Sequence, residues 1–367
     1  MTSNLKVSIP KQPTKKQRRS NKQASAPPPV PKIPEGHTIL QTDEIEIITD
    51  KAPIKMDGNF TAGKNFTIER NTKVKGLLTA GENATFKKNL TAGSFCAKDG
   101  LVVEGNAKVA KIAKLYGTSI FRNGLNAASV NAENVFVDGK TNIRGSLEAD
   151  SAALEKGLKA ALVKIRKTLK IGRTAKVNNS IISNGDAFFK KHLTAGELEI
   201  QGKAIVGGNS KIKGLAQAGA KSKLRGSLKV GSLKLGDDSR IGGRTHIENF
   251  AVVGDNVEFA ERFTAGSLNA GKGLKAGTIV LTQAGATFDE IKGLETICLT
   301  GDTRDIRDLR FNKGLKPEQM ITVIMPKGMK CRIYGKLNRQ VVKNQIKIIQ
   351  EGSFLSALRR VFTHIRI

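Results

Sequence analysis

The sequence has few of the residues that usually build a compact core. Among its 367 residues there is no Trp, there are two Tyr, and aromatic residues make up only 5%. A chain of this length could form roughly two or three ordinary domains. Because it contains 38 Gly and so few aromatic rings, we expect its core to consist of small and branched aliphatic side chains.

Cysteine is also scarce. Cys96, Cys298 and Cys331 are odd in number and far apart in the chain, which excludes a disulfide framework and a CxxC metal-binding motif and fits a reducing compartment. The first residues lack the apolar run of a secretory signal, and no stretch approaches the roughly 18 apolar residues of a membrane span. We therefore expect a cytoplasmic protein, in which any membrane association is made through basic residues.

Proline is almost confined to the N-terminal region. Seven of the ten Pro precede residue 36, and none lies between Pro53 and Pro317. The first residues combine these prolines with basic side chains and cannot bury a core, so we predict a disordered basic arm over residues 1–36. Its candidate anchoring residues for an anionic membrane surface or another polyanion are Lys15, Lys16, Arg18, Arg19 and Lys22.

Acidic residues are few relative to basic ones. The chain has 62 Lys and Arg but 32 Asp and Glu, a formal net charge of +30. The arm has eight basic residues and one acidic residue, which leaves +23 for the rest of the chain. A charge this large predicts attraction to polyanions such as nucleic acid or anionic lipid. Basic residues interleaved with aromatic ones are missing, so we expect no reading of a nucleotide sequence.

An internal repeat is the main positive feature of the sequence. A four-residue phrase, apolar-Thr-Ala-Gly, begins at Phe60, Leu78, Leu90, Leu193 and Phe263. The first three copies begin 18 and then 12 residues apart, which are multiples of six. Leu268 and Leu274 follow Phe263 at steps of five and six residues. Steps close to six residues, and multiples of six, therefore characterise the chain.

A step of about six residues matches one short strand plus its corner in a β-solenoid, where three such sides make one turn. Apolar residues alternate with outward-facing ones, as in Leu198-Glu199-Ile200. Glycine suits the corners, whereas proline cannot donate to the ladder between turns. We therefore predict an all-β fold, a β-helix or solenoid of short strands with about six residues per side over residues 37–300. The alternative is a meander of hairpins, which would need Asn-Gly or Asp-Gly pairs at strand ends.

The repeats resemble those of bactofilins, the bacterial polymer-forming cytoskeletal proteins. The resemblance rests on phrases such as Gly58-Asn59-Phe60-Thr61-Ala62-Gly63 and Gly226-Ser227-Leu228-Lys229-Val230-Gly231, and on the basic, Pro-rich N-terminal region. It covers about residues 56–300. It implies a solenoid that assembles into a homopolymer. This repeat region is longer and more basic than the compact domain usual in that family.

Beyond residue 300 the repeat fades, and we predict a small cap over residues 301–367. Residues 321–325 and 331–334 have the pattern of strands. Residues 353–367 form an amphipathic helix in this prediction, with Ser353 as the N-cap. Its apolar face would close the end of the solenoid or dock to a membrane or partner, and contains Phe354, Leu355, Leu358, Val361, Phe362 and Ile365.

These features favour a non-enzymatic scaffold that assembles end to end, because a terminal turn exposes unpaired backbone groups and apolar side chains. The residues expected to mediate assembly or capping are Phe60, Leu78, Phe354, Leu358 and Phe362. The alternative function is a structural protein, such as a virion protein, that binds nucleic acid or another polyanion.

An enzyme is the weaker alternative. Hexapeptide-repeat acyltransferases also use a solenoid of short strands and a histidine base, and here His192 and His246 are the candidates for that base. The sequence contains no G-x-x-x-x-G-K-[ST], HExxH, CxxC or G-x-S-x-G motif. We therefore expect no enzyme activity, no catalytic or metal site, no cofactor and no small-molecule substrate.

Overall fold

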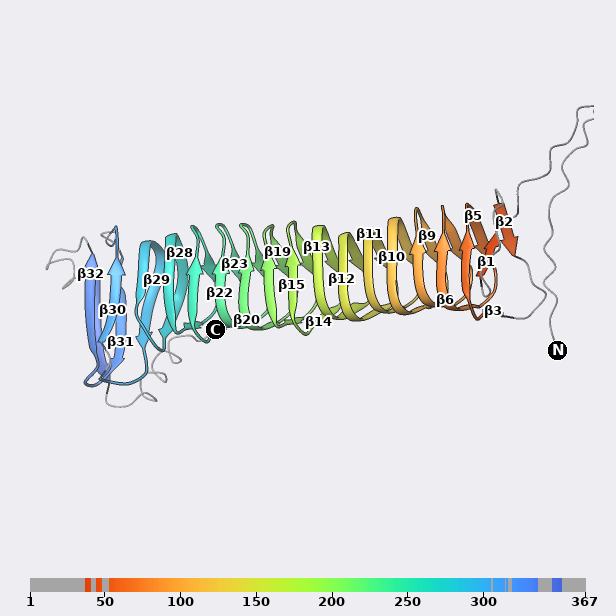
Figure 1. Cartoon of the computed structure of the whole chain (residues 1–367). Helices are drawn as coiled ribbons and strands as arrows, with labels where there is room; N and C mark the ends of the chain where they lie inside the picture. The colour runs from red at the N-terminus through yellow and green to blue at the C-terminus, as the bar shows by residue number, and fades with distance from the viewer. Residues whose placement is uncertain are drawn as a thin grey trace, which may run out of the picture.

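The computed structural model of the chain describes residues 37–40, 44–47, 53–304, 306–313, 315, 319–335 and 345–351. The elements of this part are all β-strands, which coil into a parallel β-solenoid of about 14 turns. The turns stack into an elongated rod (Figure 1). This fold confirms the predicted all-β solenoid. The predicted arm over residues 1–36 and the predicted helix over residues 353–367 lie outside the described residues.

Each turn of the solenoid has three sides. We call them side 1, side 2 and side 3, beginning in the first regular turn with β3, β4 and β5. Some strands continue around one or two corners, so a single strand can contribute to all three sides. In chain order the strands are β1 (His37–Leu40), β2 (Glu44–Ile47), β3 (Ile54–Met56), β4 (Asn59–Ala62), β5 (Asn65–Ile68), β6 (Thr72–Ala80), β7 (Ala84–Phe86), β8 (Leu90–Ala97), β9 (Leu101–Val103), β10 (Ala107–Phe121), β11 (Leu125–Val137), β12 (Lys140–Leu154), β13 (Gly157–Ile171), β14 (Thr174–Val177), β15 (Ser180–Ser183), β16 (Ala187–Phe189), β17 (Leu193–Ala195), β18 (Glu197–Ile200), β19 (Ala204–Val206), β20 (Ser210–Ala218), β21 (Lys223–Leu224), β22 (Leu228–Leu235), β23 (Arg240–Ile241), β24 (Thr245–Ile247), β25 (Phe250–Val253), β26 (Glu258–Phe259), β27 (Phe263–Ala265), β28 (Ser267–Leu281), β29 (Ala286–Leu299), β30 (Ile306–Phe311), β31 (Ile321–Pro326), β32 (Lys330–Gly335) and β33 (Ile346–Glu351).

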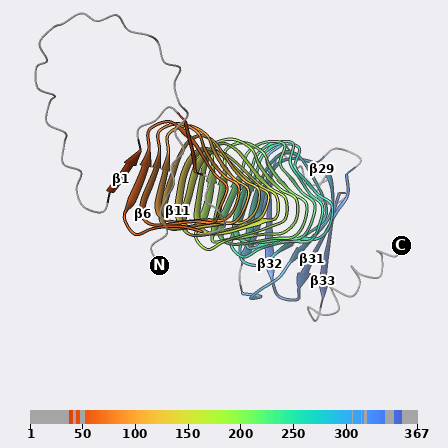
Figure 2. The ribbon, with the colours of Figure 1, turned by 90° about the vertical axis from the view of Figure 1, so that its right-hand side faces the viewer.

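Successive turns pair in parallel, so equivalent residues form columns along the rod. On side 2, Leu78 lies between Phe60 and Phe95, its register partners in the two adjoining turns. Some turns are slightly shorter than this one, as where Leu147 pairs with Val163. Turns of these lengths divide into three sides of five or six residues, as the repeat predicted. Figure 2 shows the turns stacked behind one another around a common interior.

The core has the composition that the scarcity of aromatic residues predicted. Buried Ala, Val, Leu and Ile fill most of the interior. Phenylalanine is concentrated near the N-terminal end, where the rings of Phe60, Phe66 and Phe86 follow one another with centroid separations of 5.7 and 5.4 Å. The edge-to-face arrangement of these rings adds to the stabilisation that burial provides. Two further pairs, Phe259–Phe263 and Phe288–Phe311, lie in later turns.

The parallel ladder does not stop at residue 300. β29 pairs with both β30 and β31, which in turn pair with β32 and β33. β31 and β32 cover the segments 321–325 and 331–334 that were predicted as strands. On side 3, Gln319 donates from Nε2 to the carbonyl oxygen of Ile291 at 2.7 Å. Among the described residues, the strands that follow β29 belong to sides 1 and 2.

Close stacking at the corners explains why glycine recurs there. A Cβ atom added at Gly81 would lie 1.9 Å from the carbonyl oxygen of Gly63 in the preceding turn. A Cβ at Gly63 would meet no atom of the described residues within 4 Å. The two glycines occupy the same corner in successive turns. Comparing an alanine substitution at each therefore distinguishes the effect of the steric contact from any general effect of replacing a corner glycine.

We predict that Gly81→Ala lowers the free energy of unfolding by about 1–3 kcal/mol, because the added methyl group forces the two turns apart. Gly63→Ala, the matched control, should change it by less than about 0.5 kcal/mol. Urea unfolding followed by far-UV circular dichroism measures both effects as midpoint shifts. Equal midpoints for the two variants would contradict the steric explanation.

Candidate polyanion-binding face

The outward residue at the centre of side 1 is basic or neutral in thirteen successive turns. Parallel pairing places these residues in one continuous column, which contains no Asp or Glu. In order along the rod the column consists of Lys55, Lys73, Thr91, Lys108, Asn126, Asn142, Lys159, Lys176, Thr194, Lys211, Lys229, His246 and Thr264.

The alternation within each strand points these side chains to solvent. In β20, for example, Ser210 and Ile212 are buried and Lys211 between them is exposed. All seven lysines of the column are exposed. Because strands in a ladder lie about 4.8 Å apart, the column is roughly 58 Å long. We call it the basic column.

Most of the positive charge of the basic column is not neutralised by neighbours. Within the described part, Lys229 is the one lysine of the column that makes an ion pair, at 3.6 Å from Glu248. Pairs such as Lys55 with Lys73 and Lys159 with Lys176 occupy adjacent turns in direct register. Like charges so close together repel one another. The column is therefore a concentrated source of positive potential.

Acidic residues lie at all three corners of the rod. The corner between sides 2 and 3, which is opposite side 1 in a three-sided solenoid, contains Glu82, Asp99, Glu133, Asp150, Asp186, Asp237, Asp238 and Asp255. The corners that flank side 1 also contain acidic residues, among them Glu104, Asp138, Glu155, Glu197 and Glu248. Several acidic residues pair with local bases, as Asp186 does with Lys203 at 3.3 Å. What distinguishes side 1 is therefore the absence of acidic residues from its central column.

A row of corner side chains fixes the edge of side 1 that adjoins side 3. The backbone N–H of Asn106 donates to Oδ1 of Asn89 at 2.7 Å, and the N–H of Gly124 donates to Oδ1 of Asn106 at 3.0 Å. Farther along, the imidazole of His192 takes the place of the amide, since its Nδ1 accepts from the N–H of Asn209 at 3.1 Å. Each corner side chain thereby positions the corner of the next turn.

A hollow of about 420 Å³ lies on side 1 beside this row of corners. It extends over several consecutive turns, and no acidic residue lines it. The lining residues are His192, Leu193, Thr194, Asn209, Ser210, Lys211, Ser227, Leu228, Lys229, Arg244 and His246. The two histidines considered as catalytic bases thus line the same hollow. His192 uses its Nδ1 to accept a backbone hydrogen bond, so no carboxylate orients that nitrogen as in a catalytic dyad.

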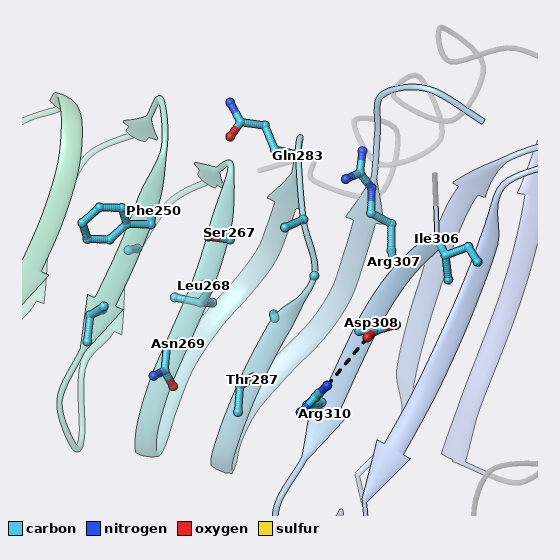
Figure 3. Close-up of a pocket in the computed structure, with 15 residues that line it drawn as sticks. Phe250, Ser267, Leu268, Asn269, Gln283, Thr287, Ile306, Arg307, Asp308 and Arg310 are labelled. Carbon is cyan, nitrogen blue, oxygen red and sulfur yellow. Dashed lines mark ion pairs between the residues drawn. The ribbon is translucent and has the colours of Figure 1, made fainter. Parts of the chain in front are cut away.

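A larger hollow, of about 700 Å³, lies near the C-terminal end and is lined by β25, β28, β29 and β30 (Figure 3). Its surface mixes exposed apolar side chains, such as Phe250 and Ile306, with polar ones. The Asp308 carboxylate forms ion pairs with Arg310 (Oδ2 to Nη2, 3.8 Å) and with Arg332 (Oδ1 to Nε, 2.8 Å). The charges of these two arginines are therefore partly compensated. This hollow lacks the electrostatic character of side 1.

The structure places the assembly residues predicted from sequence as follows. Phe60 and Leu78 are fully buried and neighbour each other in the side 2 column. β1 pairs with β4, so the strand that contains Phe60 already has a partner on each side. The anchoring residues of the arm (Lys15, Lys16, Arg18, Arg19 and Lys22) and the capping residues Phe354, Leu358 and Phe362 lie outside the described residues.

Reactive groups on the described surface are limited. Burial, together with the Asp308 carboxylate, raises the pKa of the Cys331 thiol to about 11. At neutral pH this cysteine is therefore a thiol and a poor nucleophile. Within the described ranges, no group of three or more His, Cys, Asp or Glu side chains is placed to hold a metal ion. The same ranges contain no helix with the length and apolar character needed to span a membrane.

Comparison of the chain with protein-family models, curated proteins and solved structures found no match. The class of the molecule is therefore defined by its own geometry, as a parallel β-solenoid with one basic side.

We predict that Asn89→Ala lowers the free energy of unfolding by about 1 kcal/mol, because the N–H of Asn106 loses its acceptor at the corner. The matched control is Asn126→Ala, in which an exposed asparagine of the basic column is truncated without loss of a corner hydrogen bond. Urea midpoints compare the two variants. If Asn126→Ala is as destabilising as Asn89→Ala, the corner side chains do not stabilise the stacking of turns.

Proposed function

We propose that this protein is a non-enzymatic structural rod that binds a linear polyanion, the phosphate backbone of nucleic acid, along side 1. The observation that supports this proposal is the basic column, in which seven exposed lysines and no acidic residue occupy thirteen successive turns. The basic arm would add further contacts with the same polyanion.

Counterion release supplies the affinity. Duplex DNA has one negative charge per about 1.7 Å of its axis and a condensed layer of cations, which are released when lysines neutralise phosphates. The lysines of the basic column need no conformational change to make such contacts, because the ladder already holds them in line. The threonines and asparagines between them can donate hydrogen bonds to phosphate oxygens.

Two features of side 1 favour nucleic acid over an anionic membrane. The basic column is a single line of residues, which matches a linear backbone better than a lipid plane. From Lys55 to Thr264 it contains no apolar or aromatic side chain that could enter a lipid interface, whereas surfaces that bind membranes combine basic residues with Trp, Phe or Leu. Lysine contacts to phosphates position a ligand without reading its bases, so the binding is independent of sequence.

The proposal includes a cytoplasmic location. Cys96, Cys298 and Cys331 are all free thiols in the structure, and free thiols are typical of reducing compartments.

We predict that Lys176→Glu/Lys211→Glu raises the Kd for a 30-base-pair DNA duplex about tenfold or more at about 0.1 M salt, since two phosphate contacts are replaced by repulsion. The slope of log K against log salt should fall by about 1.8. The matched control is Lys170→Glu/Lys223→Glu, with the same change of net charge at exposed outward positions of side 3. Fluorescence anisotropy measures both. Equal weakening by the two double variants would show that net charge, and not side 1, determines binding.

End-to-end assembly is a second candidate function, because the C-terminal end of the described ladder is open. β32 and β33 each pair with one strand only within the described part. Ile348 continues the inward column of Val323, yet it is 46% exposed whereas Val323 is fully buried. An apolar residue on an unpaired strand edge can bind an edge of another copy. The resemblance of the repeats to bactofilins also favours this function.

We predict that Ile348→Lys shortens or abolishes polymers of the full-length chain, because it places a charge in an apolar junction. Lys347→Gln, at the neighbouring outward position, is the control and should leave polymers intact. Sedimentation velocity and negative-stain microscopy measure the length distribution. Polymers of unchanged length in Ile348→Lys would place the junction elsewhere or eliminate this candidate function.

A further inference from the structure

The hollow on side 1 differs from the rest of the basic column because lysine, arginine and histidine side chains line it together. Lys211 and Lys229 belong to the basic column, and Arg244 lies at the adjoining corner. Small polar residues of successive turns also line the hollow. The lining includes Thr194, Asn209, Ser210 and Ser227.

Three successive corners beside the hollow are glycines. A Cβ at Gly208 would lie 2.8 Å from Nδ1 of His192, and a Cβ at Gly226 would lie 2.6 Å from Oδ1 of Asn209. A Cβ at Gly243 would lie 2.6 Å from the backbone nitrogen of Ser227. The close approach of successive turns at these corners therefore requires glycine.

The two histidines have different roles in the hollow. Nδ1 of His192 accepts a backbone hydrogen bond, so a neutral His192 has its proton on Nε2, and protonation of Nδ1 would break that bond. The imidazole of His246 makes no hydrogen bond or ion pair within the described part. Its ring nitrogens can therefore contact a ligand in the hollow without loss of a structural contact.

The charges around His246 come from four neighbouring segments. Lys229 is its register partner on one side, and Thr264 is its partner on the other. Arg244 precedes it and lies 3.7 Å from Glu261. The remaining charged or titratable groups nearby are Glu248, Arg262, Lys190, Lys191, His192, Lys211, Lys213 and Arg225. Glu248 and Glu261 do not line the hollow. They pair with Lys229 at 3.6 Å and with Arg244 at 3.7 Å, so Lys211 is the cation of the lining that makes no ion pair within the described part.

We propose that this hollow is a phosphate-binding subsite of the polyanion-binding face. This inference rests on the proposed function, since the phosphate belongs to the nucleic-acid backbone that side 1 binds. Lys211, Lys229 and Arg244 bind the phosphate through their charges, and the imidazoles of His192 and His246 contact it from the lining of the hollow.

The first test measures duplex binding by the full-length chain at fixed pH. One phosphate contact at about 0.1 M salt is worth about five- to tenfold in affinity, so Arg244→Gln, which removes a cation from the lining of the hollow, should raise the Kd for the duplex by about that factor. Arg173→Gln changes an exposed arginine at the equivalent corner of another turn, outside the hollow, and should raise the Kd less. Equal Kd values for Arg244→Gln and Arg173→Gln would overturn the subsite.

The second test observes the hollow directly, because the chain has only four histidines. The ring carbon-bound proton signals of His192 and His246 should shift when inorganic phosphate or the DNA duplex is added, and those of His37 and His364 should not. His192→Asn, which keeps an acceptor like that of Asn209 at the corner, and His246→Thr assign the two signals. Unshifted His192 and His246 signals at saturating duplex would reject the subsite.

The two proposals fail in different ways. If the wild type binds the duplex and Lys176→Glu/Lys211→Glu weakens binding while the histidine signals stay unchanged, the subsite is rejected and the polyanion-binding face is retained. If the duplex does not bind at any pH, the proposed function is rejected, and the titration with inorganic phosphate still decides whether the hollow binds the anion.

Discussion

The parallel backbone ladder between successive turns is the constraint on which the rest of this structure depends. It fixes the separation of turns at about 4.8 Å and aligns every position of one turn with its equivalents above and below. Proline would interrupt the ladder, and bulky corner residues would push turns apart, as the contact between a Cβ at Gly81 and the oxygen of Gly63 illustrates. The long segment free of proline and the glycine corners are both consequences of this one requirement.

The same ladder aligns side chains that are far apart in the sequence into continuous columns along the rod. A lysine between two buried residues, such as Lys211 in β20, is by itself an ordinary exposed charge. Parallel pairing adds Lys229 beside it, and the pattern recurs along side 1. Acidic residues lie at every corner of the rod but are absent from the central column of side 1. The column is therefore a consequence of register as much as of composition.

The fold could be predicted from the sequence because the core phrase repeats at steps close to six residues. The basic column could not be predicted in the same way. The length of a turn varies along the rod, so Lys108 and Lys159 have no fixed spacing from the lysines of other turns. Only the register of the paired strands shows that these lysines belong to the basic column. The hollow was even harder to predict, because its lining comes from several turns that only the register brings together. The burial of Phe60 and Leu78 also required knowledge of the strands that pair on either side.

Repulsion within the basic column links stability to binding. Lysines that face each other in adjacent turns, such as Lys55 and Lys73, each destabilise the ladder on the order of a few tenths of a kcal/mol. An exposed surface without a ligand gains nothing from such pairs. Under the proposed function, a polyanion along side 1 would remove this repulsion, and because it would bind the stacked turns and not the unfolded chain, it would stabilise the rod by mass action. Adjacent turns would then share one ligand, so the contact that neutralises one lysine would also strengthen the stacking of its neighbour.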